Sequence, residues 1–440
     1  MIILTKALQL ILSLSILVLL HEFGHFFFAR IFKTRVEKFY LFFDPWFSLF
    51  KFKKGETEYG IGWLPLGGYV KISGMIDESM DVEAMKLPAQ PYEFRAKPAW
   101  QRLLIMLGGV LVNFILAMVI YAGILFVWGE DYLPTQNMKY GIVADSLAMD
   151  AGFRNGDHIV AVAGKPIENF ADVTLTILLD QSKTVTVKRD SQIIELNLSP
   201  DLVGKLMRQK GFLSVRVPFI IGDFAKESPA KAAGIQKGDK IIAVNGDSTL
   251  FFDQFRSKIL QLKNQEATLT IDRAGKIETV KLVVPETALI GVMAEMNLAK
   301  YFELKHISYG FFEAIPAGIS EGVQKVSEYL KQLKLMFSPK TKGYEQLGSF
   351  MTIGSIFPSV WDWQSFWSLT AFLSVILAIM NILPIPALDG GHVMFLLYEM
   401  ITGRKPGDKF MEYAQITGMV LLIGLMLLAN YNDVMRFFFK

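Results

Sequence analysis

Four long apolar runs constrain this chain more than any other feature of its sequence. A helix that spans a bilayer needs about 20 predominantly apolar residues, and uncharged runs cover residues 7–20, 103–129, 365–383 and 413–431. The first run continues into more apolar residues without a small-residue cleavage site, which favours a retained helix over a secretory signal. The sequence therefore predicts an α-helical membrane protein with four transmembrane helices.

Composition narrows the possible functions. Hydrophobic residues make up 52% of the 440 residues, the formal net charge is +3, and cysteine is absent. A charge this close to balance gives no sign of a nucleic-acid-binding surface. Because thiolates are absent, any metal site must consist of His, Asp or Glu side chains.

Basic residues orient the predicted helices. They gather in the connection between the first and second runs and in the one between the third and fourth, where the positive-inside rule predicts a cytoplasmic location. Both termini and the long 130–364 segment would then lie outside. The residues concerned are Lys33, Arg35, Lys38, Lys51, Lys53, Lys54, Arg95, Lys97, Arg102, Arg404, Lys405 and Lys409.

The 130–364 segment contains an internal repeat. Residues 145–164 read DSLAMDAGFRNGDHIVAVAG and residues 227–246 read ESPAKAAGIQKGDKIIAVNG, with ten of twenty positions identical at an offset of 82. Each copy has a short helix signal, a Gly-x-x-x-Gly-Asp turn and an alternating apolar strand. Two copies of about 80 residues are too few for a solenoid, so we expect tandem α+β domains.

The first apolar run leads into a metal-binding motif. His21-Glu22-Phe23-Gly24-His25 has the HExxH spacing, which on a helix places both imidazoles on one face, where they can bind one zinc ion. Glu22 is then the candidate general base for peptide hydrolysis. Ionisable residues within a transmembrane helix indicate function by default. The alternative is a polar cluster that only orients helices.

A catalytic zinc ion needs a third protein ligand. Asp389 follows the third apolar run in a segment whose helix is broken by Pro384 and Pro386. Irregular backbone at membrane depth must line a cavity or be covered by protein, so Asp389 is a candidate ligand. An N-cap role is the alternative, because Asp is a preferred helix N-cap. His392 competes with Asp389 for the metal.

Residues 59–71, YGIGWLPLGGYVK, alternate and are rich in glycine. This pattern predicts a β-hairpin that is too apolar for a free cytoplasmic loop. Open sheet edges are tolerated in a membrane only where protein covers them or water fills a cavity. We therefore expect the hairpin to dip into the membrane against the transmembrane helices.

The repeat resembles PDZ domains, particularly those of bacterial membrane and periplasmic proteases. The pattern Ser-Pro-Ala-x-x-Ala-Gly-Ile-x-x-Gly-Asp-x-Ile at 228–241 carries the resemblance, and Leu147 replaces its proline in the first copy. PDZ domains bind peptide C-termini by strand addition and capture the carboxylate with backbone amides. Candidate carboxylate loops are Gly141-Ile142 and Ile220-Ile221. A spacer or size filter that binds no peptide is the alternative.

Four features together resemble the site-2 protease family of M50 intramembrane zinc metalloproteases, in particular its sigma-E-regulating bacterial branch. They are HEFGH in the first span, LPLGGYVK after it, tandem PDZ-like domains, and NILPIPALDGGH after the third run. The resemblance covers essentially the whole chain. It implies that His21, His25 and Asp389 bind one Zn²⁺, that Glu22 is the catalytic base, and that Asn381 holds substrate near the zinc.

The same resemblance implies a substrate class and a location. Gly67, Gly68 and Tyr69 of the predicted hairpin would pair with an unwound substrate segment. Substrates would be single-pass membrane proteins already trimmed by another protease, such as anti-sigma factors, or leftover signal peptides. The protein would lie in a bacterial inner membrane with its PDZ domains in the periplasm and its active site near the cytoplasmic side.

The predicted fold is thus four transmembrane helices, a membrane-associated β-hairpin and two extracytoplasmic PDZ domains of the α+β class. The expected boundaries are 1–32 for the first span, 33–99 for the loop with the hairpin, 100–129 for the second span, 130–205 and 206–290 for the PDZ domains, 291–362 for a helical segment, 363–400 for the third span with the Asp389 motif, and 409–437 for the fourth span.

Two features depart from the family. In its Gly-Pro-x-x-Asn motif, Gly109 and Asn113 are kept but Val110 replaces the proline. The 75–100 segment, with acids at 77, 78, 81 and 83, matches no expected pattern and has no predicted role.

Two other classes of function stay open. A metal transporter also places His and Asp in the membrane, although it needs neither the Glu of HExxH nor peptide-binding domains. An inactive scaffold would use the PDZ domains alone.

Overall fold

The computed structural model describes residues 2–439 except 66, 76–87 and 210, so the acids at 77, 78, 81 and 83 lie outside the described residues. The chain divides into two compact units. The first comprises Met1–Gly129, Ser308–Lys334 and Tyr344–Lys440, and the second comprises Glu130–Ile307 and Leu335–Gly343.

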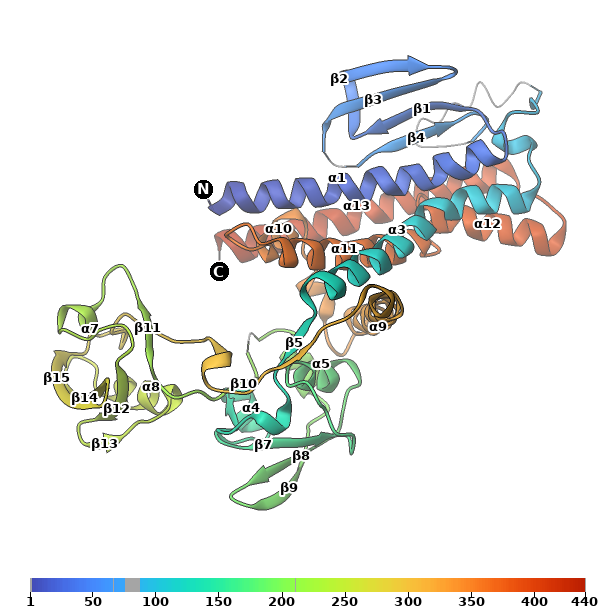
Figure 1. Cartoon of the computed structure of the whole chain (residues 1–440). Coiled ribbons are helices and arrows are strands. Elements are labelled where there is room, and N and C mark those ends of the chain that lie inside the picture. The colour runs from blue at the N-terminus through green and yellow to red at the C-terminus, as the bar shows by residue number, and fades with distance from the viewer. Residues whose placement is uncertain (1, 66, 76–87, 210, 440) are drawn as a thin grey trace. The chain divides into compact units, whose positions relative to one another are not determined.

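Among the described residues, four helices of the first unit are long and apolar enough to cross a membrane, which confirms the prediction of four candidate spans. The helix α3 contacts both α1 and α11 (Figure 1). All four are rich in Leu, Ile, Val, Phe and Ala, and such helices must satisfy their backbone groups internally in lipid. They are α1 (Ile2–Ile31), α3 (Ala99–Trp128), α11 (Trp363–Ile382) and α13 (Asp408–Phe438).

The third predicted span is two helices rather than one. α11 ends at Ile382 and α12 (Asp389–Thr402) begins seven residues later. Pro384 and Pro386 have no backbone N–H to continue the helix, and Ala387 has a positive φ of 84°. The expectation of one span over 363–400 is therefore wrong, because two helices cover this range. The break between them lies directly before the candidate metal ligand Asp389.

A four-stranded sheet lies along α1 (Figure 1). Its order is β2-β3-β1-β4, with β3 parallel and β4 antiparallel to β1. The predicted hairpin over 59–71 is wrong, because β3 and β4 lie on opposite sides of β1. The tight turn is instead at Gly55, whose φ of 63° suits glycine. The strands are β1 (Val36–Leu41), β2 (Phe43–Lys54), β3 (Thr57–Leu64) and β4 (Tyr69–Ile72).

Further helical elements pack within the first unit or join it to the second. Asp433 of α13 is buried and accepts hydrogen bonds from the backbone N–H groups of Ser349 (3.0 Å) and Thr352 (3.1 Å), which ties α10 to α13. A Cβ on Gly318 of α9 would lie 2.3 Å from Ala122 N of α3, so these helices pack closely. The elements are η1 (Phe94–Ala96), α9 (Phe311–Met336), η4 (Gly343–Gln346) and α10 (Phe350–Ile356).

The second unit contains two copies that share the order strand, helix, strand, helix and three strands, with further short elements in each. The first copy has β5 (Glu130–Tyr132), η2 (Thr135–Asn137), β6 (Ile142–Ala144), α4 (Ser146–Asp150), β7 (His158–Val162), α5 (Ala171–Leu179), β8 (Thr184–Arg189), β9 (Gln192–Asn197), α6 (Leu202–Leu206) and β10 (Leu213–Val215). The second has β11 (Ile221–Phe224), α7 (Pro229–Ala232), β12 (Lys240–Val244), β13 (Asp247–Ser248), α8 (Phe252–Gln261), β14 (Glu266–Arg273), β15 (Lys276–Val283) and β16 (Val292–Ala294).

Strand pairing corrects the expected boundaries of these copies. β6 pairs with β10 and β11 pairs with β16, so the first copy extends beyond residue 205 and the second beyond 290. Residues 291–310 are also not helical throughout. They contain the end strand β16, η3 (Leu298–Lys300), and β17 (Lys305–Ile307), which pairs with β5.

Each copy holds a buried aspartate from its Gly-x-x-x-Gly-Asp turn. Asp157 accepts from Arg189 through Nε (2.7 Å) and Nη2 (2.8 Å), and Asp239 accepts from Arg273 through Nε (2.8 Å) and Nη2 (2.6 Å). A backbone N–H at 2.8 Å completes each cluster. Because every oxygen is satisfied by a bidentate guanidinium and an amide, both carboxylates are structural.

Candidate active site

The two histidines of HExxH come together on α1. His21 and His25 are one helical turn apart, and both are largely buried, at 8% and 7% exposure. Their Nε2 atoms lie 3.3 Å apart. Four-residue spacing on a helix stacks the side chains on one face, so the predicted pairing of the imidazoles is present.

Asp389, the first residue of α12 after the break that follows α11, completes the cluster. Its Oδ2 lies 3.2 Å from His21 Nε2 and 3.4 Å from His25 Nε2. A Cβ on Gly390 would lie 2.1 Å from Leu383 O, so only glycine fits the tight connection that presents the aspartate. The three candidate ligand atoms all lie within 4.8 Å of one another.

The hydrogen-bond roles of these atoms fit a cation. His25 Nδ1 lies 2.9 Å from the carbonyl oxygen of Ile105 on α3. A carbonyl only accepts, so Nδ1 carries the proton and Nε2 presents a lone pair. Asp389 Oδ2 is buried without a hydrogen-bond donor among the described residues. Lone pairs facing a carboxylate repel one another unless a positive ion lies between them, which is the arrangement of a zinc site.

Asn113 of α3 contacts the other histidine. Its Nδ2 lies 3.2 Å from His21 Nδ1, while its Oδ1 is buried with no partner among the described residues. Amide O and N atoms are assigned from their surroundings. With the amide turned over, Oδ1 accepts from Nδ1–H and leaves His21 Nε2 for the metal. Sequence reasoning noted Asn113 only as part of a motif and missed this contact. Its signal is a polar residue within an uncharged run.

Glycines allow α1 and α3 to approach this closely. A Cβ on Gly109 would lie 2.5 Å from His25 Nε2 and 2.6 Å from His21 Cε1. A Cβ on Gly24 would lie 2.2 Å from Gly108 O. Small residues at helix interfaces permit such backbone contact in membranes. Any larger residue at 109 would therefore displace both imidazoles.

Glu22 lies on the side of α1 that faces the sheet. A Cβ on Gly68 would lie 3.4 Å from Glu22 Cγ and 2.7 Å from Tyr40 O. The residues just before β4 therefore pass beside the candidate base. Gly67 instead lies against the ring of Phe43. The side chain of Tyr69 donates to Asp44 Oδ1 (2.9 Å), so its link to the site is through its backbone.

Two further residues were predicted near the metal. Asn381, in the last turn of α11, places Nδ2 3.4 Å from His21 Nε2, at the edge of the cluster. His392 lies in α12 and contacts Gln415 instead, with its Nε2 3.3 Å from Gln415 Nε2. Asp389 does not act as a side-chain N-cap, because Leu388 occupies that position without a capping bond.

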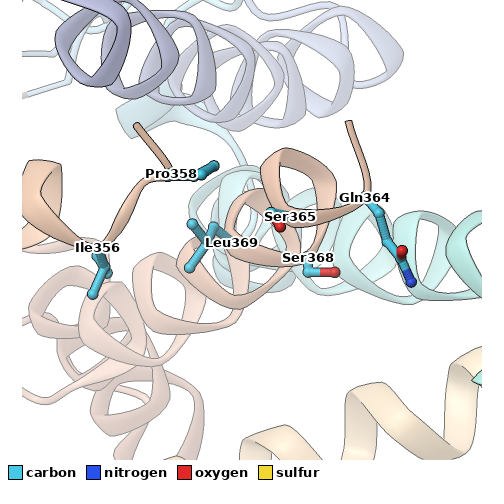
Figure 2. Close-up of a pocket in the computed structure, with 6 residues that line it drawn as sticks. All are labelled: Ile356, Pro358, Gln364, Ser365, Ser368 and Leu369. Atoms are coloured by element: carbon cyan, nitrogen blue, oxygen red, sulfur yellow. The ribbon is translucent and has the colours of Figure 1, made fainter. Parts of the chain in front are cut away.

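A pocket of about 460 Å³ lies elsewhere in the first unit. Its place at the start of α11 is more than three helical turns from Asn381, about 18 Å along the axis from Leu369 at 1.5 Å per residue. It is therefore separate from the metal cluster. Figure 2 shows its lining residues, Ile356, Pro358, Gln364, Ser365, Ser368 and Leu369.

The predicted carboxylate loops of the second unit have their amides engaged. The backbone N–H groups of Gly141, Ile142, Ile220 and Ile221 donate to Met138, Asp157, Pro218 and Asp239 carbonyl groups at 2.9–3.1 Å. None of the four is left to hold a carboxylate in this structure. Each copy also has an edge strand near this region, because β10 pairs with β6 and β16 pairs with β11 in two-stranded sheets.

Comparison with known proteins supports a protease. Residues 9–425 match Peptidase family M50. A predicted zinc metalloprotease of Neisseria meningitidis is 28% identical over 98% of both chains. Metalloprotease MmpA of Caulobacter vibrioides is 26% identical over 98% of this chain and 95% of its own. Protease RseP of Yersinia pestis is 28% identical over 97% of both.

Proposed function

Because the chain belongs to Peptidase family M50 and is a zinc metalloprotease of the membrane, we propose that it cleaves peptide bonds within transmembrane segments of single-pass proteins. One observation carries the proposal. The candidate ligands His21 and His25 come from one membrane-length helix, and Asp389 follows the break that ends another. A protease whose metal ligands lie on such helices is suited to substrates within the bilayer.

The roles of the residues follow from their positions. When bound, zinc supplies Lewis-acid polarisation of the scissile carbonyl and of water. Glu22 takes the proton from the attacking water and returns it to the amide nitrogen that leaves. Asn381 donates from Nδ2 to a substrate carbonyl near His21. Asn113 and the Ile105 carbonyl hold the imidazole rings in orientation.

The sheet gives a means of presenting the substrate. β4 is an edge strand, and Gly68 just before it lies against Glu22. An extended peptide that adds to β4 would pass the catalytic base with its backbone exposed. A transmembrane helix must unwind to do so, because helical peptide bonds are hydrogen-bonded internally.

We further propose that the two copies of the second unit are PDZ domains that select substrates. Each has an edge strand, β10 or β16, with apolar side chains packed on its core. These edges suit strand addition by a peptide C-terminus, such as one produced by an upstream protease. Domains of this kind would also exclude untrimmed proteins by size. Substrates in this class would include anti-sigma factors and signal-peptide remnants.

The proposed location follows the charge pattern. Basic residues flank the sheet-side connection, so the positive-inside rule puts the metal cluster near the cytoplasmic side of a bacterial inner membrane and the second unit in the periplasm. This orientation can be tested with cysteines introduced one at a time into the cysteine-free chain. A thiol reagent that cannot cross the membrane would block those on the outer side.

The decisive variant is Glu22→Gln. We expect it to retain one zinc per chain, to lose cleavage of a single-pass reporter by about 10³-fold or more, and to capture single-pass membrane proteins in the native membrane. Glu286→Gln, at an exposed position of the second unit, is the matched control and should cleave normally. Zinc transport by a chain that never cleaves any membrane protein, or capture of soluble proteins alone, would contradict the proposal.

A further inference from the structure

The β2–β3 hairpin carries an exposed aromatic surface that includes none of the candidate metal ligands. Trp46 is 91% exposed, and Phe47, Leu49, Phe50 and Phe52 are also exposed. Isolated exposed apolar residues are normal, but a contiguous patch on one hairpin marks an interaction surface.

This surface continues from a membrane-length helix. Phe26 of α1 contacts Phe23 on its own helix (6.4 Å between ring centroids) and Tyr59 of β3 (6.1 Å). Tyr59 stacks on Phe52 of β2 (5.3 Å), which contacts Phe50 (5.8 Å). The aromatic rings thus form a continuous row from α1 to the outer strand of the sheet. We therefore expect the hairpin to share the surroundings of this part of α1.

The two faces of the hairpin differ in chemistry. Phe50 and Phe52 pair with Ile61 and Tyr59, so these four side chains share one face. Lys51 and Lys53 alternate with the two phenylalanines and therefore lie on the opposite face, while Lys54 stands beside the turn. The result is an aromatic face backed by a basic one.

No acidic side chain among the described residues neutralises these lysines. The three acids of the hairpin have other partners: Asp44 accepts from the Tyr69 hydroxyl (2.9 Å), Glu56 pairs with Arg35 (3.8 Å), and Glu58 accepts from the Tyr40 hydroxyl (2.7 Å). Among the described residues, no ion pair includes any of the three lysines, which are all exposed. The positive charge is therefore available to an anionic partner.

The edge of β2 is poorly suited to another protein strand. Pro45 removes a backbone donor, the register shifts on both sides of Ser48, and lysines crowd the far end. Natural edge strands use these features to avoid pairing. Aromatic side chains with adjacent lysines are instead the composition of the membrane interface, where rings sit at headgroup depth and lysines extend to phosphates.

We propose that the β2–β3 hairpin is an interfacial anchor that binds anionic phospholipids of the bilayer. Phe50 and Phe52 enter the boundary between headgroups and acyl chains, and Lys51, Lys53 and Lys54 contact lipid phosphates. The anchor holds the sheet at a fixed depth beside α1. It requires neither the metal nor cleavage.

The absence of cysteine allows a site-specific test in the full chain. A fluorophore is attached to Phe50→Cys in nanodiscs of equal phosphatidylcholine and phosphatidylglycerol, with bromine carried by one lipid at a time. We expect strong quenching by both and several-fold stronger quenching by brominated phosphatidylglycerol. Two positions of similar exposure are controls: Leu427→Cys on α13, quenched equally by both lipids, and Ile277→Cys on β15, quenched by neither.

The lysines are tested in the same protein. Replacing Lys51, Lys53 and Lys54 with alanine should bring the quenching ratio at residue 50 to one, because the attraction of these lysines for an anionic lipid surface is lost. Replacing Lys237, Lys276 and Lys281 of the second unit should leave it unchanged. Quenching at residue 50 as weak as at 277, a ratio of one in the unaltered chain, or protection from both lipid and water by a protein strand would overturn the proposal.

Discussion

The chain buries similar aspartates in two regions for opposite purposes. Asp157 and Asp239 of the second unit each receive an arginine fork and a backbone amide. Asp389 of the first unit instead faces two imidazole nitrogens, and its buried Oδ2 has no hydrogen-bond donor among the described residues. A buried carboxylate is tolerated where charge and hydrogen bonds compensate it. The fully compensated pair stabilises its fold, and the uncompensated aspartate marks the candidate cation site.

The difference also shows in how the partners are supplied. Asp239 and Arg273 lie on one small domain, joined by a few strands. Asp389 meets His21 only because α1, α3 and the broken end of α11 pack together. The structural clusters are thus local and repeated, whereas the metal cluster depends on the assembly of the whole helical unit.

Asp389→Asn should produce the largest effect. The anionic ligand is lost, so the purified chain should contain little zinc and cleavage should fall by about 10³-fold, equivalent to about 4 kcal/mol of transition-state stabilisation. Without zinc, the variant should be at least as stable as the unaltered chain without zinc, because the substitution removes a buried charge that no ion compensates. Metal analysis and thermal unfolding measure both. Zinc retained at one per chain would show that Asp389 is not a ligand.

Asp239→Asn should do the reverse. Removing one partner of a buried ion pair costs about 3–5 kcal/mol, so hydrogen exchange in β12 and β14 should accelerate while zinc content stays at one per chain. Asp157→Asn should do the same in β7 and β8. Asp201→Asn, at an exposed position, serves as the control with an effect below about 0.5 kcal/mol. Unchanged exchange in the Asp239 variant would contradict a structural role for this aspartate.

The sequence predicted the parts of the site that depend on local rules. His21 and His25 follow from helical spacing, and Asp389 from a proline-broken span that had to be covered. The sequence left His392 as a competitor, and only tertiary packing excludes it from the cluster. The Ile105 carbonyl was beyond reach, because a backbone group has no sequence signal and its contact depends on the register between α1 and α3.

The fold shows the same limit. Four spans and two repeats follow from hydropathy and internal identity. The strands around residues 59–71 were expected, but their pairing was not, because alternation predicts a strand and not its neighbour. β1 lies between β3 and β4, and this insertion cannot be read from a short segment. The carboxylate loops were misplaced for a related reason, since the amides at Ile142 and Ile221 are used within each domain.

Asn113 offers a finer test of the candidate metal cluster, because it contacts His21 without being a candidate ligand. Asn113→Ala should weaken zinc binding by about 10–100-fold, the usual effect of losing a residue that orients a ligand. Asn113→Asp should restore binding, because a carboxylate oxygen can accept from His21 Nδ1–H. Competition with a chelator measures both affinities, independently of cleavage. Thr370→Val is the control, since Thr370 is a buried polar residue of α11 that contacts Ser13.

Failure of the aspartate variant alone would argue for the opposite amide orientation, with Nδ2 donating to a bare Nδ1. In that case the proton of neutral His21 would be on Nε2, and this nitrogen could not bind the metal as proposed. The two substitutions together therefore separate a ring-orienting contact from simple packing.

The smallest effect concerns pH. Burial alone would raise the pKa of Asp239, but the Arg273 guanidinium and the Gln236 N–H outweigh it and hold the pKa below its usual value. A group whose pKa is lowered by folding stabilises the fold above its unfolded pKa, about 3.9 for Asp, and loses this contribution as pH falls through the folded pKa. The stability difference between the unaltered chain and Asp239→Asn should therefore be constant from pH 7 to about pH 5 and shrink below about pH 4. Hydrogen exchange in β12, corrected for the intrinsic rate, measures it. If the stability difference shrank between pH 7 and pH 5, another group would dominate its pH dependence. The ion pair with Arg273 would then not be what distinguishes Asp239 from Asp389.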